Sequence, residues 1–428
     1  MKRILISIMI IGALILSAQG AALAAAITIL HEFEGYPGDG AYASASMVLS
    51  GSTLYGVTSG GGASDVGTLF KVNTDGTGYL VLHEFTGTGE VGSPYAALTL
   101  SGNTIYGTSA GGGATNEGTV YKYDISSGNV TLVHEFVPSE ANNFCGGVTL
   151  VDGTLYGMGM FGGANSAGSI YKVNANGSDF SVMYDFAGGF GSGVNPYGEI
   201  LYNPSDNKLY GGTPWGGISG AGNIFTINTN GTGYENIYEF AGADGSEPFG
   251  DLVLGPDDML YGTTGSGGDY GYGTVFRMST DGSGMEVLHS FNNADGYYPY
   301  IGGLAFAPDG RLVGTTYYGG EFGAGVIFSL DQDGTDFALL HEFSSPGPAG
   351  PQATRLILTS NNKIYGVTRD GGASGIGTVY SMDYPTPEPA TVVSGLIGLL
   401  GLAGRRLMRR KKLVNPDKSE ILALYAKK

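Results

Sequence analysis

A segment of about 50 residues recurs seven times along this chain, and the repetition limits the folds that the chain can adopt. The first full copy contains the stretch LYGVTSGGGASDVGTLFKVNTDGTGYLVLHEF at 54–85. Three anchors mark each copy: LYG, then GT followed by an apolar and an aromatic residue, then HEF. The LYG anchor falls at Tyr55, Tyr106, Tyr156, Tyr210, Tyr261, Val313 and Tyr365. A near-constant period of this length is typical of stacked supersecondary units.

Each copy is expected to form four short strands. In the second copy these are 96–100, 104–108, 119–124 and 130–136, rich in β-branched and aromatic residues and bounded by Gly, Asn or Ser. The 78 glycines of the chain favour tight turns over helices. The prediction is an all-β fold, a seven-bladed β-propeller of four-stranded antiparallel blades over 25–383.

The phase of the two ends predicts a closed ring. The repeats begin with a fourth strand at 27–33 and end with a third strand at 377–382, so seven complete blades require the first strand to dock on the last. Closure removes the exposed edges that an open array would have. An open solenoid of the same units is the alternative.

Charge and cysteine content exclude several classes of function. Between 25 and 389 there are nine basic residues against 36 acidic ones, a formal balance of −27. Such a surface repels phosphate backbones, so we expect no nucleic-acid partner, whereas neutral sugars, cations and cationic partners are compatible with it. Cys145 is the only cysteine, which leaves no disulfide and no cysteine metal cluster.

Both ends indicate export. Residues 1–24 combine a basic start, an apolar run and a small-residue cleavage pattern, as expected of a signal peptide. At the other end lie a Pro-rich linker (384–389), an uncharged apolar segment (390–404) and a basic tail (405–428), a pattern typical of a membrane segment whose cationic side stays cytoplasmic. We therefore expect anchoring in the inner membrane before any processing.

This ending resembles the PEP-CTERM sorting signal of Gram-negative bacteria. The residues that carry the resemblance are Pro387, Glu388, Pro389, Arg405, Arg406, Arg409 and Arg410. The resemblance implies recognition by an exosortase, cleavage near the PEP motif, and attachment at the cell surface or release to the extracellular matrix.

The repeats resemble the tandem GloVer repeat of exported bacterial proteins. The segments LYGVTSGGGASDVGTLFKVNTDGTGY and LYGTTGSGGDYGYGTVFRMSTDGSG carry this resemblance, which spans 27–383. It implies export and anchoring, and it supplies no catalytic residues.

The repeated polar motifs are expected to be structural. All five histidines lie in the HEF anchor, at His31, His83, His134, His289 and His341, so they belong to different blades and cannot converge on one metal ion. We expect them to pack and to form hydrogen bonds between blades. The glycine-rich stretches such as 60–62 lack a P-loop lysine, and the acidic turn at 331–334 lacks the rest of a calcium loop. No cofactor and no metal site are predicted.

Aromatic residues give the only candidate binding site. The second-to-third and the fourth-to-first strand connections are expected to share one face. Just before the first strand of each blade, a circle of aromatic side chains near the channel mouth is predicted, interrupted by Gln352 and formed by Tyr42, Tyr95, Phe144, Tyr197, Phe249 and Tyr300. Repeat-specific aromatics join this face at Phe161, Trp215, Tyr270, Tyr272, Tyr317, Tyr318 and Phe322. Such side chains are suited to stacking on sugar rings. Nearby acids could form hydrogen bonds with the sugar hydroxyls; the candidates are Asp244, Glu247, Asp269, Asp295 and Glu321. Gap filling between loops is the alternative.

The functional prediction is a non-enzymatic, exported propeller that binds polysaccharide or a surface protein. One rival is a propeller-type glycosidase or polysaccharide lyase, for which Asp244, Glu247 and Asp295 are the candidate acids. The other rival is a purely structural matrix protein.

Overall fold

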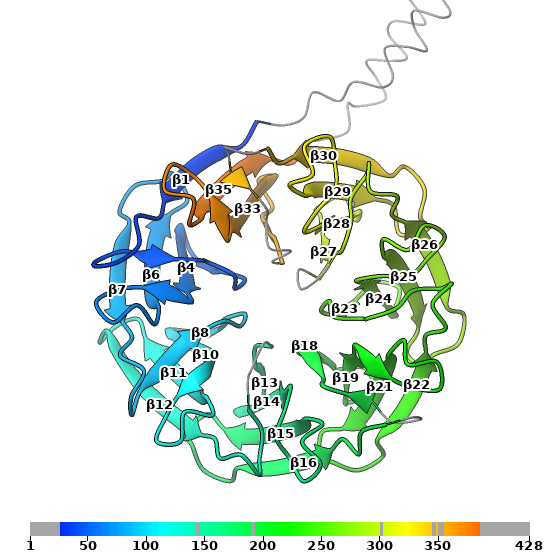
Figure 1. Ribbon diagram of the computed structural model, residues 1–428, viewed down its shortest axis with the longest axis horizontal. Coiled ribbons are helices and arrows are strands. Elements are labelled where there is room, and N and C mark those ends of the chain that lie inside the picture. The colour runs from blue at the N-terminus through cyan, green and yellow to red at the C-terminus, as the bar shows by residue number, and fades with distance from the viewer. Residues whose placement is uncertain are drawn as a thin grey trace, which may run out of the picture. The chain divides into compact units, whose positions relative to one another are not determined.

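Each repeat folds into one four-stranded antiparallel sheet in the computed structural model of the protein (Figure 1). The structure describes residues 26–142, 146–189, 193–299, 303–344, 348–349 and 355–385. Seven sheets, called blades 1 to 7, stand around a common axis, which confirms the predicted propeller. The predicted signal peptide (1–24), PEP motif (387–389), apolar segment (390–404) and tail (405–428) lie outside the described residues. Among the described residues, no helix is long and apolar enough to cross a membrane.

The strands follow the same order in every blade, with the first innermost and the fourth at the rim (Figure 1). Blade 1 contains β3 (Val48–Ser50), β4 (Thr53–Thr58), β6 (Thr68–Asn73) and β7 (Leu80–Glu84). Blade 2 contains β9 (Thr99–Ser101), β10 (Thr104–Gly112), β11 (Thr119–Asp124) and β12 (Asn129–Glu135), with β8 (Val91–Pro94) paired to the end of β10. Blade 3 contains β13 (Thr149–Val151), β14 (Thr154–Gly159), β15 (Ser169–Asn174) and β16 (Ser181–Asp185).

The remaining blades repeat this plan. Blade 4 contains β18 (Tyr197–Asn203), β19 (Lys208–Thr213), β21 (Asn223–Asn228) and β22 (Glu235–Glu239). Blade 5 contains β23 (Val253–Leu254), β24 (Met259–Thr264), β25 (Thr274–Ser279) and β26 (Glu286–Ser290). Blade 6 contains β27 (Ala305–Phe306), β28 (Leu312–Thr315), β29 (Val326–Leu330) and β30 (Ala338–Glu342). Blade 7 contains β32 (Ile357–Leu358), β33 (Lys363–Thr368), β35 (Thr378–Asp383) and, from the other end of the chain, β1 (Thr28–Glu32).

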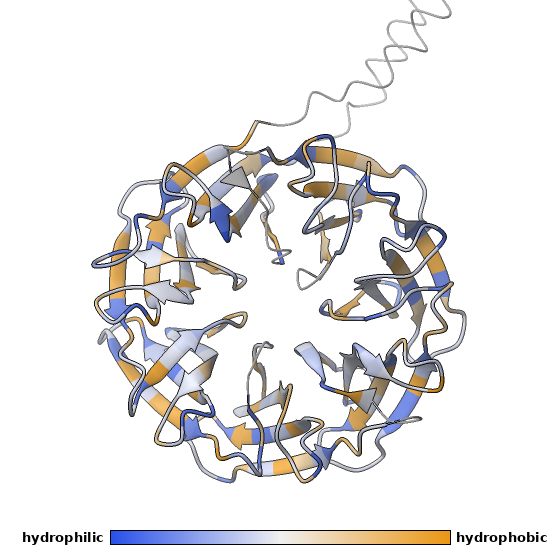
Figure 2. Cartoon of the chain, viewed as in Figure 1, coloured by the Kyte–Doolittle hydropathy of each residue, from blue (hydrophilic) through white to orange (hydrophobic). Residues whose placement is uncertain are grey.

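Strand β1 closes the ring, as the phase of the repeats predicts. It pairs antiparallel with β35, where Ile29 lies opposite Tyr380 and Glu32 opposite Thr378. Seven hydrophobic clusters lie between the blades, one for each pair of neighbours, and one of them joins blade 7 to blade 1 around Phe33. The most hydrophobic stretches lie within the strands (Figure 2). The open-solenoid alternative is therefore wrong.

The LYG and GT anchors belong together because an aromatic ring of the third strand covers the glycine of the second strand. A Cβ atom built on Gly262 would lie 2.6 Å from Phe276 and 2.9 Å from Leu252. The same glycine and aromatic pair occurs in every blade, at 56 and 70, 107 and 121, 157 and 171, 211 and 225, 262 and 276, 314 and 328, and 366 and 380. The glycine makes room for a fully buried ring, which explains why both anchors recur at a fixed offset.

Replacing Gly262 with alanine should overpack blade 5. Because Phe276 and Leu252 are both buried, we expect the G262A variant to lose about 1–3 kcal/mol of unfolding free energy, measured by denaturant titration. Gly38 is the control, since a Cβ atom there meets nothing within 4 Å. The G38A change should stay within about 0.5 kcal/mol of the parent, and an equal loss for both variants would contradict the packing argument.

The HEF anchor connects each blade to the next. Its phenylalanine packs on the buried aromatic of the following blade, for example Phe136 on Tyr171 with ring centroids 4.9 Å apart. In blades 2, 3, 5 and 7 its histidine or tyrosine also stacks on an aromatic of that next blade, as His134 does on Phe180 at 3.8 Å and His289 on Phe337 at 3.8 Å. The predicted packing role between blades is confirmed for these histidines.

The histidine or tyrosine of the HEF anchor is also bound by an acidic residue from the connection that follows it in the chain. His31 pairs with Asp39 at 3.0 Å, His83 with Glu90 at 2.6 Å, His134 with Glu140 at 3.0 Å and His289 with Asp295 at 3.3 Å. In blade 4, Tyr238 donates its hydroxyl hydrogen to Asp244 in the same way. Burial alone raises the pKa of Asp39, but hydrogen bonds from His31 and Tyr79 outweigh it and hold that pKa below its usual range.

The first strand of blade 2 is shorter than the sequence pattern suggests. In blade 2 the prediction places it at 96–100, but β9 begins at Thr99. The reason is that Leu98 donates its backbone N–H to the Ser46 carbonyl of blade 1 at 3.3 Å instead of joining the strand ladder. The segment before β9 thus contacts blade 1.

Candidate functional site

The connections predicted to share one face do so. The fourth-to-first connection pairs with the second-to-third connection of the same repeat in three small ribbons. These are β2 (Gly40–Ala41) with β5 (Gly60–Gly61), β17 (Gly193–Val194) with β20 (Trp215–Gly216), and β31 (Pro348–Ala349) with β34 (Asp370–Gly371). This side of the ring is called the loop face below.

In the described connections, a residue other than glycine recurs in a left-handed backbone conformation on the loop face. In five blades its N–H donates to the carbonyl just before the GT anchor of the preceding blade, at 2.8 to 3.1 Å. The five residues are Tyr42, Ser93, Asn195, Glu247 and Tyr298, with φ between 50° and 62°. Such a conformation costs energy for residues other than glycine, so the surrounding bonds must hold it.

This geometry corrects the predicted aromatic ring. Tyr42 shares the backbone conformation and bonding of Ser93, so it is equivalent to Ser93 and not to Tyr95. Tyr197 and Phe249 do pack together, with ring centroids 5.2 Å apart and nearly perpendicular. Phe144, Tyr300 and Gln352 lie outside the described residues.

A continuous aromatic belt crosses blades 4 to 6 on the loop face. Trp215 packs edge-on against Phe249 at 5.4 Å, and Phe249 contacts Tyr298 at 6.4 Å. From Tyr298 the belt continues through Tyr297, Tyr318, Tyr317 and Tyr272, with centroid separations of 4.4 to 5.8 Å. Trp215 and Tyr318 keep 37% and 46% of their surface exposed. The structure thus brings together four of the seven predicted site residues: Trp215, Tyr272, Tyr317 and Tyr318.

The other three predicted residues stand apart from the belt. Phe161, Tyr270 and Phe322 are exposed, and among the described residues no ring contact joins them to it. Phe161 occupies the place of Trp215 in blade 3, five residues after the LYG tyrosine, and its backbone pairs with Asn142. Its position matches that of the tryptophan, but its ring is not part of the belt.

Most acids predicted to accompany the aromatics have other partners or lie elsewhere. Asp244 and Asp295 bind Tyr238 and His289 in the HEF contacts between blades. Glu247 lies beside the belt, because its carbonyl accepts the N–H of Phe249 at 2.8 Å. Burial raises the pKa of the Glu247 carboxyl, and a hydrogen bond from Ser266 opposes the rise. The three acids suggested for a glycosidase or lyase therefore do not provide a catalytic pair of carboxylates in one site.

A second candidate site lies nearer the axis. It is formed by one position per blade, the residue just before the buried apolar side chain that precedes the first strand or, in blade 4, belongs to it. In blade order this position holds Ser46, Ala97, Gly147, Glu199, Asp251, Gly303 and Arg355. Neighbouring members are in close contact, since Arg355 donates its N–H to Ser46 Oγ at 2.9 Å and a Cβ atom on Gly303 would lie 2.9 Å from Asp251. Four members are small, and three carry charge.

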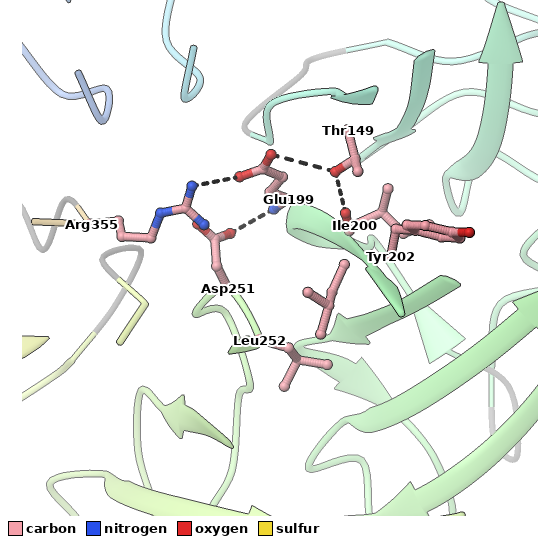
Figure 3. A pocket seen from close by; sticks show the side chains of 8 residues that line it. Thr149, Glu199, Ile200, Tyr202, Asp251, Leu252 and Arg355 are labelled. Carbon is pink, nitrogen blue, oxygen red and sulfur yellow. Dashed lines mark hydrogen bonds and ion pairs between the residues drawn. The ribbon is translucent and has the colours of Figure 1, made fainter. Parts of the chain in front are cut away.

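The three charged side chains converge (Figure 3). Glu199 donates its backbone N–H to Asp251 Oδ1 at 2.6 Å, and Arg355 Nη2 lies 3.4 Å from Glu199 Oε2. Thr149 Oγ1 lies 3.4 Å from Glu199 Oε1 and also donates to the Ile200 carbonyl. Blades 3, 4, 5 and 7 thus contribute to one polar group, called the axial cluster.

Burial sets the protonation of the axial cluster. It raises the pKa of the Glu199 carboxyl to about 7, a rise that Arg355 opposes and the neighbouring Asp251 increases. Burial also raises the pKa of Asp251, against the effect of Arg355. Asp251 is only 5% exposed. Two carboxyl groups therefore share one guanidinium where ionisation of both is unfavourable.

The sequence prediction missed the axial cluster although a signal was present. Glu199, Asp251 and Arg355 are separated by more than 50 residues from one another, and none lies in an anchor. Equivalent positions of a propeller come together near its axis. Charged residues at a position that is otherwise Ser, Ala or Gly would have revealed the cluster.

Seven blades, β1 closure and a loop face with repeat-specific side chains define a closed β-propeller built from tandem repeats. The chain belongs to the Gloeobacter/Verrucomicrobia repeat family, whose model matches residues 20–201 and 189–380. Comparison with curated protein sequences gives no match. Among the described residues, no three His, Cys, Asp or Glu side chains are grouped so that they could hold a metal ion.

Solved structures share the fold at low identity. An oligogalacturonate lyase in complex with manganese is 11% identical, with a TM-score of 0.56 over 85% of this chain and 94% of that one. The GH74 enzyme of Niastella koreensis is 16% identical, with a TM-score of 0.56 over 84% of this chain and 54% of that one. TolB from Acinetobacter baumannii is 15% identical with a TM-score of 0.41 over 63% of this chain, and this chain spans 58% of TolB. The likenesses to the lyase and to the GH74 enzyme concern the fold alone.

Proposed function

We propose that the protein is an exported propeller displayed at the cell surface or in the extracellular matrix, where it binds polysaccharide through the aromatic belt without chemical conversion. Export rests on the signal-peptide pattern at 1–24 and on the ending that resembles a PEP-CTERM signal, read by exosortase-type machinery. A surface protein is the alternative partner, and a purely structural matrix role is the alternative function.

The observation that carries the binding proposal is the belt itself. Tyr318 stacks on Tyr297 with ring planes 29° apart, while Trp215 stands nearly perpendicular to Phe249. Partly exposed aromatic faces pack against the apolar faces of sugar rings, and nearby polar groups then accept hydroxyl hydrogens. Glu247 is such a group, beside the belt. At the Trp215 position, blades 1 and 2 carry glycine, so these blades add no aromatic side chain there.

Trp215→Ala should weaken polysaccharide binding about tenfold, which corresponds to about 1.4 kcal/mol. The side chain is partly exposed, so its removal should leave the fold intact, as judged by thermal unfolding. Affinity is measured by retention of the full-length protein on exopolysaccharide of the producing organism. Leu80→Ala, at an exposed residue of the rim strand β7, is the matched control and should bind as the parent does. Unchanged affinity for W215A would remove the belt as the site.

The same incubation separates binding from catalysis. We expect retention of the protein with no shorter sugars released. Release of new oligosaccharides would replace the binding proposal with the glycosidase or lyase alternative. Absence of both retention and products would favour the structural role or a protein partner.

A further inference from the structure

A cavity of about 220 Å³ opens beside the axial cluster. Its polar end is formed by Glu199, Asp251, Arg355 and Thr149, and its walls by Ile200, Leu201, Tyr202 and Leu252 (Figure 3). The innermost parts of blades 3, 4, 5 and 7 supply this lining, so the cavity lies toward the axis and is separate from the aromatic belt.

We propose that this cavity is a binding site for a small organic amine, with the ammonium group held by Glu199 and Asp251 and the apolar part against Ile200 and Leu252. The site is independent of the polysaccharide function. Its members carry two potential negative charges and one positive charge, so a monocation brings the ionised cluster to neutrality. A cation is also the charge that the strongly acidic repeat region attracts.

The hydrogen bonds within the cluster leave capacity for a ligand. Glu199 Oε2 is fully buried and accepts no hydrogen bond among the described residues, although Arg355 Nη2 lies 3.4 Å away. Only one oxygen of Asp251 has a bond from a described residue, the 2.6 Å bond from the Glu199 N–H. Buried carboxylate oxygens are rarely left unsatisfied. An ammonium group supplies three donors at this place.

Stability alone does not account for the cluster. Burying ionised groups is costly, and apolar replacements of a buried ion cluster are often neutral or stabilising. Four blades place Ser, Ala or Gly at the same position, so the propeller does not require charge there. Charged side chains from three different blades have instead been brought to one cavity.

Size and charge select the ligand class. The cavity is smaller than the roughly 300–1,000 Å³ typical of larger ligand pockets, so it suits a compact molecule and not a polysaccharide segment. Arg355 opposes a divalent metal ion, which would also need more oxygen ligands than two carboxylates provide. The apolar walls favour an alkyl or aryl group attached to the cation over a bare inorganic ion.

The test is calorimetric titration of the full-length protein with n-butylammonium chloride, n-butanol, sodium butyrate and potassium chloride. We expect one butylammonium bound per chain, at least tenfold tighter than butanol or potassium, and no binding of butyrate. The affinity should rise between pH 6 and pH 8, because the proton on Glu199 competes with the amine; Asp251, Arg355 and Tyr202 are the other titratable groups that line the cavity. Equal affinity for butanol or potassium, or no binding, would overturn the proposal.

Variants make the result specific. Asp251→Asn should weaken butylammonium binding at least tenfold. Measured at pH 9, where the proton competes least for Glu199, Arg355→Gln should strengthen binding at least threefold by removing a like charge. If Arg355 had only a structural role, R355Q would bind butylammonium equally well or more weakly. R355Q therefore tests the proposal even if D251N unfolds. Asp383→Asn, at a carboxylate 76% exposed on blade 7, is the control and should bind as the parent does.

Discussion

A chain that lacks residues 26–33 should lose its cooperative folded state, because strand β1 completes blade 7. Deletion leaves the edge of β35 unpaired and removes Leu30 and Phe33, both buried, from the cluster between blades 7 and 1. It also removes Ile29 from the cluster between blades 6 and 7. Thermal unfolding followed by circular dichroism should show a broad transition at a much lower temperature than in the parent.

Single substitutions compare the stability of the closing interface with that of an internal interface between blades. Phe33→Ala should cost about 3–5 kcal/mol, as is usual for a buried phenylalanine, and Phe186→Ala, at the same place between blades 3 and 4, should cost a similar amount. Equal losses mean that the closing interface is as well formed as an internal one. If F33A cost far less than F186A, or if a synthetic peptide of 26–35 failed to raise the stability of the deleted chain, the closed ring would be contradicted.

The blades and their closure could be predicted because they depend on local sequence that recurs. The glycine of LYG, the aromatic of the GT anchor and the phenylalanine of HEF each contact a partner at a fixed repeat offset, as Gly262, Phe276 and Phe240 do. Seven repetitions make such a pattern visible without knowledge of any single contact. The pairing of acids with the HEF histidines was missed, although these acids follow at a spacing of only six to eight residues, and Asp295 was assigned to the aromatic face instead.

The candidate site could be predicted only in part, because its contacts join different blades. Trp215 and Tyr318 were predicted as repeat-specific aromatics of the loops. Their connection through Phe249, Tyr298 and Tyr297, however, depends on left-handed turns that the sequence did not show. Tyr42 was aligned with the wrong position for the same reason.

The two candidate sites exploit the same property of a repeat propeller. The anchors fix the backbone, so positions between anchors can differ from blade to blade without loss of the fold. On the loop face blades 4 to 6 use this freedom to build the belt from Trp215, Tyr297 and Tyr318, and nearer the axis three blades use it to place charge. A site in this protein is therefore recognised as a difference between repeats, not as a motif.

Stability between pH 5 and pH 8 should decrease as the pH rises, and Glu199 should account for much of the change. Burial raises its pKa from 4.5 to about 7 in the folded protein, so the folded state holds this proton more tightly than the unfolded chain. The stabilisation is complete below the unfolded pKa and is lost as the pH rises through the folded pKa. Its size is on the order of 3 kcal/mol, and Asp251, whose pKa is also raised, contributes in the same direction.

Glu199→Gln tests this prediction because an amide keeps the size of the side chain and cannot ionise. The unfolding free energy of the parent, from denaturant titrations at each half unit of pH, should fall by a few kcal/mol across the window, while that of E199Q should be nearly flat. The window stays above pH 5 because Asp39 and Glu90, whose pKa values are lowered, lose their contribution only in more acidic solution. Parallel curves for parent and variant would mean that Glu199 is ionised throughout, and Arg355 would then dominate the axial cluster.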